Sequence, residues 1–213
     1  VGADSNIGEK GMGNEVRRAR ILEVRPENKY MRTYAAGIRN PVGLAFYPGS
    51  NTLWTVVNER DMLGSDLVPD YLTDVDEGDF FGWPWYYWGG FTDPRVAPEA
   101  EDRRQYVKRP QYALGVHVAP LGMTFTNGLD LGDRWANGAL IALHGSWNRD
   151  PVSGYDVVFV KFGDNGKPLD ALPVTLLDQF VAKDGKTTRG RPADVKVAKD
   201  GSALVADDTG GII

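Results

Sequence analysis

The chain has 213 residues, of which 24 are basic and 29 acidic, and a net charge of −5 without a dense basic run. This balance argues against nucleic acid as a partner, and the lack of cysteine excludes disulfides, thiolate metal sites and a cysteine nucleophile. No stretch approaches the roughly 20 apolar residues of a transmembrane segment. The first residue is Val, and the residues that follow do not show the charged and then apolar pattern of a signal peptide.

The composition, with 26 Gly, 13 Pro, 6 Trp, 9 Tyr and 8 Phe, favours an all-β fold with many turns. In chain order, residues 19–24 and 30–35 are expected to be short strands. Residues 37–59 then predict a hairpin, because an alternating apolar run, a Pro-Gly-Ser-Asn turn and a second apolar run follow one another.

Residues 58–79 are acidic and are interpreted as a loop, and residues 93–109 as a polar excursion on the surface. The aromatic run between them, residues 80–88, is expected to pack between sheets rather than to stack on a sugar or a planar cofactor. The acidic loop also suggests Ca²⁺ binding. An EF-hand is rejected, because the twelfth position from Asp74 is Trp85 instead of Glu. A calcium site made of loop carbonyl oxygens stays open.

The hairpin pattern recurs twice. Residues 120–125 (PLGMTF) resemble residues 41–46 (PVGLAF), and residues 192–197 (PADVKV) begin a third copy. Further strands are expected at residues 138–144, 155–162, 174–180 and 203–208. Repetition of such a block predicts a β-propeller, of which this chain covers about three blades as one domain, 1–213. A closed propeller needs at least about four blades, so the others are expected from the N-terminal half of the same propeller or from a second copy of the chain.

One end of the innermost strands of a propeller faces a shared central pocket, so polar residues at equivalent points of each copy are expected to converge there. No single member is diagnostic, since an arginine beside a strand is usually solvated or ion-paired, a histidine at a strand end is usually structural, and two aspartates before Thr-Gly-Gly are usually turn formers. The convergent set is Arg39, Asn40, Asn58, Glu59, His117, His144, Arg191, Asp207 and Asp208.

No P-loop, dinucleotide glycine fingerprint, G-x-S-x-G elbow or H-E-x-x-H motif is present, which argues against most hydrolase and NAD-dependent functions. Instead, five segments together resemble the soluble quinoprotein glucose and sorbosone dehydrogenases, and most closely the L-sorbosone or aldose sugar dehydrogenase branch. They are GIRNPVGLAF, NERDMLGSDLVPDYL, GDFFGWPWYYWGG, HGSWNR and GRPADVKVAKDGSALVADD, in that order along nearly the whole chain.

The resemblance implies a six-bladed β-propeller, exported to the periplasm or secreted, that binds pyrroloquinoline quinone (PQQ) and Ca²⁺. It implies oxidation of an aldose or sorbosone by hydride transfer to a Ca²⁺-bound quinone, with electrons passed to an external acceptor. The chain then resembles the C-terminal half, which is expected to be inactive alone.

By resemblance, Arg39 and Asn40 match the pair that contacts the reactive carbonyls of the quinone, and Arg39 would stabilise the negative charge that develops there. His117, His144 and Arg191 match other cofactor-contacting positions, which suits a tricarboxylate cofactor. The backbone carbonyls of Arg60 and Asp61 match a Ca²⁺-holding position.

The chain also departs from the pattern. His144 stands where glucose-oxidising members carry Lys, and Ala193 where some carry a second Arg. Neither histidine matches the catalytic base, which lies on an earlier blade in that family. Two alternatives remain open: a Ca²⁺-dependent propeller hydrolase resembling a lactonase, with Asn58, Glu59 and Asp207 around a metal, and a non-catalytic propeller that binds carbohydrate or protein.

Overall fold

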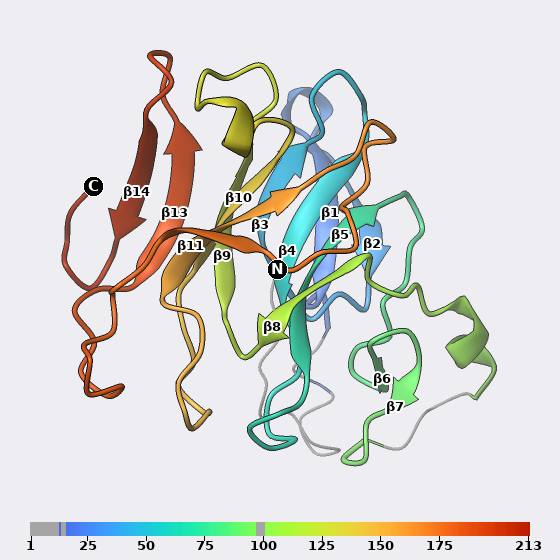
Figure 1. Ribbon diagram of the computed structural model, residues 1–213. Coiled ribbons are helices and arrows are strands. Elements are labelled where there is room, and N and C mark those ends of the chain that lie inside the picture. The colour runs from blue at the N-terminus through green and yellow to red at the C-terminus, as the bar shows by residue number, and fades with distance from the viewer. Residues whose placement is uncertain (1–12, 14–15, 97–100) are drawn as a thin grey trace.

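The computed structural model describes residues 13, 16–96 and 101–213, and this part of the chain consists of β-strands, loops and short 3-10 helices (Figure 1). The strands are β1 (Arg20–Arg25), β2 (Tyr30–Ala36), β3 (Asn40–Phe46), β4 (Leu53–Asn58), β5 (Pro69–Val75), β6 (Tyr86–Tyr87), β7 (Phe91–Thr92), β8 (Tyr112–Val116), β9 (Pro120–Phe125), β10 (Gly138–Leu143), β11 (Asp156–Lys161), β12 (Val174–Leu177), β13 (Pro192–Val197) and β14 (Ala203–Asp207). The 3-10 helices are η2 (Pro26–Asn28), η3 (Glu101–Tyr106) and η4 (Asp133–Trp135).

The strands form two complete antiparallel sheets of four strands each. The first blade has the order β3-β4-β5-β8 and the second blade the order β9-β10-β11-β12. The pair β1-β2 precedes the first blade and the pair β13-β14 follows the second, while β6-β7 is a small separate hairpin. The all-β propeller fold with about three blades is therefore confirmed, as two full blades flanked by two half-blades.

The repeat predicted from the sequence is confirmed by the strand register. Pro41 lies opposite Val57, Pro120 opposite Leu143, and Pro192 opposite Asp207, so each proline lies in the first or second position of its inner strand, opposite the end of the neighbouring strand. The three strands that these prolines open, β3, β9 and β13, lie next to one another (Figure 1). Proline is tolerated at such a place because it is at the start of a strand and on the inner edge of its sheet.

In the first two copies the second residue after the proline is a glycine, Gly43 or Gly122, and this residue determines how closely the inner strands approach. A Cβ atom added to Gly43 would lie 2.6 Å from the Leu121 carbonyl oxygen of β9, and one added to Gly122 would lie 2.5 Å from the Asp194 Cα of β13. Real Cβ atoms do not come so near to backbone. Glycine at these two positions is thus what allows neighbouring inner strands to pack backbone against backbone.

We expect Gly43→Ala to destabilise the fold by about 1–3 kcal/mol, since the added methyl group must push β3 and β9 apart. The midpoint of urea-induced unfolding measures this loss. Val42→Ala is the matched control: it removes a side chain that is 41% exposed on the same strand and should change the midpoint little. Equal midpoints for the two variants would contradict the close approach of the strands.

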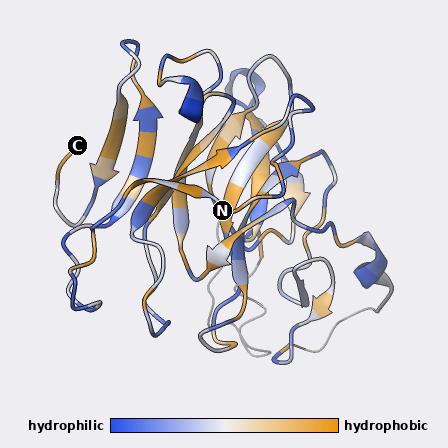
Figure 2. Cartoon of the chain, viewed as in Figure 1, coloured by the Kyte–Doolittle hydropathy of each residue, from blue (hydrophilic) through white to orange (hydrophobic). Residues whose placement is uncertain are grey.

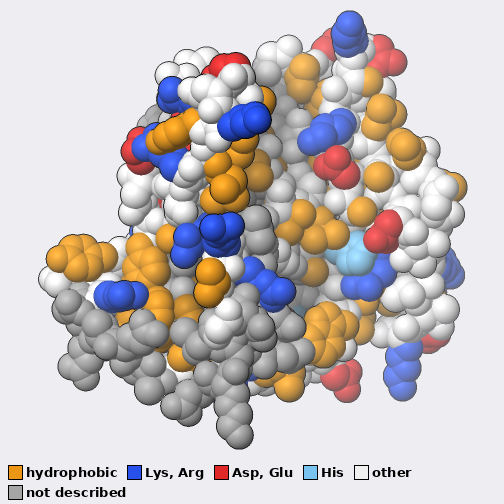
Figure 3. Space-filling view, turned by 180° about the vertical axis from the view of Figure 1, so that it is seen from behind, with side chains coloured by type: hydrophobic (Ala, Val, Ile, Leu, Met, Phe, Trp, Pro, Cys, Tyr) orange, Lys and Arg blue, Asp and Glu red, His pale blue; other side chains and the backbone are white. Residues whose placement is uncertain are grey.

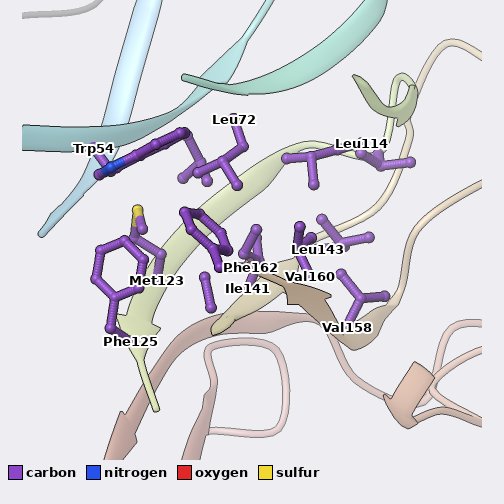
Figure 4. Close-up of a cluster of buried hydrophobic side chains, with 13 residues drawn as sticks. Trp54, Leu72, Leu114, Met123, Phe125, Ile141, Leu143, Val158, Val160 and Phe162 are labelled. Carbon is purple, nitrogen blue, oxygen red and sulfur yellow. The ribbon is translucent and has the colours of Figure 1, made fainter. Parts of the chain in front are cut away.

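Hydrophobic side chains fill the spaces between successive sheets. In one cluster, Trp54, Leu72 and Leu114 of the first blade face Met123 and Ile141 of the second (Figure 4). A second cluster lies between β1-β2 and the first blade, around Tyr71 and Ile38, and a third lies between the second blade and β13-β14, around Phe159 and Val195. The strands of the two full blades are accordingly apolar over much of their length, while the loops at their ends are largely polar (Figure 2).

The interpretation of residues 58–79 as a loop is wrong in part, because β5 crosses the middle of this acidic segment. Its carboxylates are buried without being left unpaired: Asp70 accepts hydrogen bonds from two backbone N–H groups, and Asp74 accepts one from the ammonium of Lys167. Strand β8 was also not anticipated. Of the excursion predicted at residues 93–109, residues 97–100 lie outside the described part, and the segment after them includes η3.

Within the described ranges, no helix is long and apolar enough to cross a membrane.

Candidate functional site

A cavity of about 300 Å³ lies where the inner strands β3, β9 and β13 begin. The first blade contributes Arg39 and Asn40 to its lining, the connection between the blades contributes His117, and the start of β13 contributes Arg191. His144, which directly follows β10, completes the set. The structure therefore brings all five predicted cofactor-binding residues into one cavity, and their binding of a cofactor stays a prediction.

Arg39 is almost completely buried at the base of this cavity. Its Nη1 donates to the backbone carbonyls of Asn58 (3.0 Å) and Glu59 (2.7 Å), and its Nη2 donates to Asp61 Oδ2 (3.1 Å). The pairing of Asn40 with Asn58 across β3 and β4 places these acceptors beside it, as the hairpin predicts. Its third nitrogen, Nε, is buried without a hydrogen-bond partner in the described part of the chain. The guanidinium is thus fixed in place by three hydrogen bonds, and its Nε–H is left without an acceptor.

Two buried carboxylates brace the loop that holds Arg39. Asp70 of β5 accepts hydrogen bonds from the backbone N–H of Glu59 (2.8 Å) and of Ala119 (2.8 Å), which ties the end of β4 to the start of the second blade. Burial raises the pKa of Asp70 to about 7, against the opposing effect of these two N–H groups. Burial likewise raises the pKa of Glu59 to about 8, opposed chiefly by the charge of Arg39.

We expect the stability of the protein to fall as the pH rises from about 5 to about 8. Both carboxyl groups have folded-state pKa values above those of an unfolded chain, so ionisation favours unfolding progressively until the pH passes the folded values of about 7 and about 8. Urea midpoints measured across this range test the expectation. Asp70→Asn should flatten the profile, whereas Asp66→Asn, at an exposed position, should not. A profile that rises over this range would contradict the buried-carboxyl assignment.

Arg60, expected from the resemblance to offer its carbonyl to a metal, has a side chain that is completely buried and serves the structure. Its guanidinium forms a bidentate ion pair with Asp93, with Nη2 2.7 Å from Oδ1, and its Nη1 donates to the Asp61 carbonyl oxygen. Asp61 itself lines the cavity, whereas Arg60 does not. The role of their carbonyls in holding Ca²⁺ stays a prediction.

His117 is enclosed by two oxygen acceptors. Its Nε2 lies 2.9 Å from the Gly64 carbonyl oxygen and its Nδ1 lies 3.4 Å from Asp61 Oδ1. Burial disfavours the imidazolium, but the hydrogen bonds with Asp61 and Gly64 and the charges of Asp61 and Asp70 outweigh it and raise the pKa of His117. A carbonyl oxygen can only accept, so Nε2 carries a proton. His117 is consequently poorly suited to take a proton from a substrate.

The loop after β10 carries His144 and is held by the third repeat. Arg191 Nε donates to the His144 carbonyl oxygen (3.0 Å) and its Nη2 to the Gly145 carbonyl oxygen (2.6 Å), while its guanidinium lies over the ring of Tyr155. His144 Nε2 lies 3.0 Å from Asp208 Oδ1. In the view from behind, a histidine lies beside acidic and basic side chains on this face of the molecule (Figure 3).

The same loop is also braced against the first blade. Asn148 Nδ2 donates to Asp61 Oδ1 (3.2 Å), and Arg149 Nε donates to the Ser65 carbonyl oxygen (2.9 Å). Next to them, Trp147 lines the cavity with a side chain that is mostly exposed. The walls of the cavity are therefore joined across the two blades by Asn148 and Asp61, which line it, and by the neighbouring Arg149.

Three members of the convergent set do not line the cavity: Glu59, Asp207 and Asp208. Asp207 Oδ1 accepts hydrogen bonds from the backbone N–H groups of Arg191, Thr209 and Gly210, which confirms it as a turn former. The sequence analysis missed four residues that line the cavity or support it, namely Asp70, Asp93, Trp147 and Asn148. Only HGSWNR, already noted as a motif, pointed to the last two.

Among the described residues, no group of three or more His, Cys, Asp or Glu side chains is placed to hold a metal ion. This result does not test the predicted Ca²⁺ position, because that position relies on backbone carbonyls.

Several curated proteins are similar to the chain, and three of them illustrate the range. An uncharacterised protein of Borreliella burgdorferi is 32% identical over 92% of this chain and 52% of its own length. A PQQ-dependent pyranose dehydrogenase of Coprinopsis cinerea is 29% identical over 75% of this chain and 27% of its own. Aldose sugar dehydrogenase YliI of Escherichia coli is 27% identical over 94% of this chain and 49% of its own. The chain spans about half or less of the length of these relatives.

Solved structures share the fold, among them the following two. The calcium structure of a Trichoderma reesei carbohydrate-active enzyme of family AA12 superposes with a TM-score of 0.79 at 20% identity, covering 99% of this chain and 62% of that one. The holo form of the Coprinopsis cinerea pyranose dehydrogenase PQQ domain superposes with a TM-score of 0.74 at 24% identity, covering 100% and 64%. The family described as TrAA12-like matches residues 91–213, more than half of the chain, and the protein therefore belongs to the TrAA12-like family.

Proposed function

We propose that the chain is part of a PQQ-dependent sugar dehydrogenase. The observation that carries the proposal is the cavity itself, in which Arg39, Asn40, His117, His144 and Arg191 meet from separate repeats. Two curated relatives named as sugar dehydrogenases, one of them PQQ-dependent, support the same class of reaction. The aldose or pyranose named for those relatives is the substrate class we expect. No reported relative is named as a sorbosone dehydrogenase, so sorbosone is the less supported substrate.

The donors in the cavity fit a planar anionic cofactor. Arg39 Nε is a buried N–H without an acceptor in the described part, and an unpaired buried donor is costly, so an acceptor oxygen from a ligand is favoured there. Arg191 also lines the cavity, and its Nη1 makes no hydrogen bond to the described residues, so this nitrogen is available to an anionic group.

The fit to Ca²⁺ is weaker. Carbonyl oxygens are suitable ligands for this cation, but the Asp61 carbonyl already accepts a hydrogen bond from the Arg60 guanidinium, which would place two positive charges beside one oxygen. Ca²⁺ thus remains part of the proposal through the family resemblance, and the roles described below do not depend on it.

PQQ, when bound, would supply an ortho-quinone that accepts a hydride from the sugar carbon. Arg39 would stabilise negative charge on an oxygen placed next to its free Nε, and its three other hydrogen bonds would keep it from moving as that charge appears. His117 would keep its Nε2–H on the Gly64 carbonyl oxygen, and Asp61 next to its Nδ1 raises its pKa, which favours the positively charged form. The base that removes the sugar hydroxyl proton is expected outside this chain, on a preceding blade.

The remaining blades are proposed to come from the N-terminal half of the same propeller or from a second copy of the chain. An external electron acceptor is needed to return the cofactor to its oxidised form. A periplasmic or secreted location is proposed from the resemblance alone.

The alternative of a lactonase-like hydrolase needs several carboxylate side chains around one metal, and no described group of three such residues favours it. A non-catalytic carbohydrate-binding propeller has no observation of its own in support.

Titration of the purified protein with PQQ, with and without Ca²⁺, tests the proposal by calorimetry. Reduction of a dye in the presence of aldoses, pyranoses or sorbosone tests turnover once the remaining blades are supplied. We expect saturable PQQ binding at one site per cavity. Lack of PQQ binding by the completed propeller, or binding without turnover of any of these sugars, would refute the assignment.

A further inference from the structure

Two consecutive residues of the loop after β10, Trp147 and Asn148, line the cavity that Arg39 and His117 also line, here called the cofactor cavity. Trp147 has an exposed indole ring. Asn148 has an amide oxygen, Oδ1, that is buried without a hydrogen-bond partner in the described part of the chain. An unpaired buried acceptor is costly, so a donor group from a ligand is favoured beside it.

The orientation of the Asn148 amide follows from its contact with Asp61. Its Nδ2 lies 3.2 Å from Asp61 Oδ1, and a carboxylate oxygen that is paired with an arginine accepts hydrogen bonds, so the amide nitrogen has to face it. Asp61 Oδ2 accepts from Arg39 Nη2 (3.1 Å). The unpaired Nε–H of Arg39 and the unpaired Oδ1 of Asn148 therefore belong to two side chains that the same carboxylate holds.

These two unpaired atoms need ligand groups of opposite kinds. Arg39 Nε needs an acceptor, which a quinone or carboxylate oxygen of the cofactor would provide. Asn148 Oδ1 needs a donor, and neither of those oxygens carries a hydrogen to donate. A hydroxyl group does. Asn148 thus fits a second ligand that bears hydroxyl groups and lies in the same cavity as the cofactor.

Trp147 offers a flat apolar surface at the same place. All six tryptophans lie in the described ranges, and Trp147, at 66% exposed, is the one that is mostly open to solvent. Its loop is held on both sides. The Ser146 backbone N–H donates to the Ser153 carbonyl oxygen (2.9 Å), the Ser146 carbonyl oxygen accepts from the Tyr155 hydroxyl (2.6 Å), and Asn148 is held by its bond across the blades. The exposed ring is thus presented by a braced segment.

An exposed indole next to an unpaired acceptor suits the ring form of a sugar. The faces of a pyranose carry C–H groups, which pack on the electron-rich face of an aromatic ring, while its hydroxyl groups lie around the edge and can donate hydrogen bonds. An open-chain sugar has no such face. Trp147 and Asn148 provide both kinds of contact from adjacent positions of the chain.

We infer that Trp147 and Asn148 form the sugar-recognition side of the cofactor cavity. The indole stacks on the C–H face of a pyranose, and the Asn148 amide oxygen accepts a hydrogen bond from one of its hydroxyl groups. The inference rests on the proposed function for the identity of the cavity, and it narrows the substrate to a sugar in its closed ring form.

Binding is tested first by calorimetry on the complete propeller without PQQ, with glucose, galactose and xylose as probes. We expect saturable binding of at least one of them. Trp147→Ala should weaken it about tenfold, and Trp147→Phe less, because a ring face is kept. Phe91→Ala is the matched control, since Phe91 is 61% exposed but does not line the cavity. Lack of binding of all these sugars, or equal weakening by Trp147→Ala and Phe91→Ala, would overturn the inference.

The hydrogen bond to Asn148 is tested with the monodeoxy derivatives of the sugar that binds best. In the unchanged protein, removal of the hydroxyl that faces Asn148 should weaken binding about tenfold, and in Asn148→Leu the same removal should have little effect. Loss of the contact with Asp61 would instead weaken binding of every derivative alike. Asn127→Leu is the control, because Asn127 also has a buried, unpaired Oδ1 but lies outside the cavity. Identical deoxy-sugar profiles for the unchanged protein and Asn148→Leu would remove Asn148 from the site.

Turnover separates this inference from the proposed function. In the PQQ-loaded, complete propeller, Trp147→Ala should raise the KM for the sugar about tenfold and leave the affinity for PQQ unchanged. Sugar binding with the expected losses but without turnover would refute the dehydrogenase function and support the inference. Turnover with an unchanged KM in Trp147→Ala would support the function and overturn the inference.

Discussion

Asp93→Asn is expected to lower the free energy of unfolding by about 3–5 kcal/mol, because it leaves the guanidinium of Arg60 buried without a counter-charge. Arg60 is completely inaccessible to solvent and Asp93 nearly so. Asp93 also accepts a hydrogen bond from the backbone N–H of Arg95, so the loss extends to the loop that it organises. Urea unfolding at neutral pH measures the change.

A double variant distinguishes the ion pair from general damage to the loop. Arg60→Met combined with Asp93→Leu removes both charges, and we expect it to recover most of the stability lost in Asp93→Asn. Glu77→Gln is the surface control. Glu77 makes a similar bidentate ion pair with Arg32, but this pair is exposed to solvent, so the loss of the Glu77 charge should change the unfolding midpoint little. A Glu77 effect as large as that of Asp93 would contradict the importance of burial.

Arg39→Lys is expected to weaken PQQ binding about 10- to 100-fold, which corresponds to roughly 1.5–3 kcal/mol for a hydrogen bond to a charged group. An ammonium group cannot reach the Asn58 and Glu59 carbonyls and the Asp61 carboxylate together while also presenting a further N–H to a ligand. Calorimetric titration with PQQ measures the loss.

Arg189→Lys is the control for this second prediction, since Arg189 is an exposed arginine outside the cofactor cavity. Unfolding curves of both variants establish that each is folded before binding is compared. If Arg39→Lys bound PQQ as tightly as Arg189→Lys, Arg39 would have to be removed from the cofactor-binding set.

Much of the fold could be predicted because the repeat consists of local sequence patterns of apolar and turn residues. The Pro-x-Gly-x-x-Phe copies at 41–46 and 120–125 are apolar runs next to turn residues, and such signals act within a few positions of the chain. Strand β5 escaped prediction for the opposite reason. Its Asp70 and Asp74 look like surface residues until the backbone N–H groups and the lysine that satisfy them are brought from distant parts of the chain.

The residues of the candidate site likewise divide into those that local sequence patterns predict and those that depend on contacts with distant residues. Arg39, His144 and Arg191 could be grouped from their places in the repeat, because equivalent strand ends meet at the centre of a propeller. The pairing of Arg60 with Asp93 could not be foreseen, since 33 residues separate them and neither position has a counterpart in the other repeats. Asn148 was likewise hidden, because its value lies in a hydrogen bond to Asp61 on another blade.

The braces between the blades bear on how this propeller could be rebuilt. Asn58 donates to the Pro120 carbonyl oxygen of the next blade, Asn148 reaches back to Asp61, and Arg191 holds the loop of the blade before it. A chimera that exchanges one whole blade for a homologous one would cut all the braces on both of its sides. The segment to exchange is instead the contact region between two blades, which runs from the middle of one sheet to the middle of the next. A recombination library with crossovers in the turn before β4 and between Asn148 and β11 keeps Asn58, Asp61, Pro120 and Asn148 on one parental segment, and it should therefore retain ligand-binding proteins that a library with crossovers at blade boundaries loses.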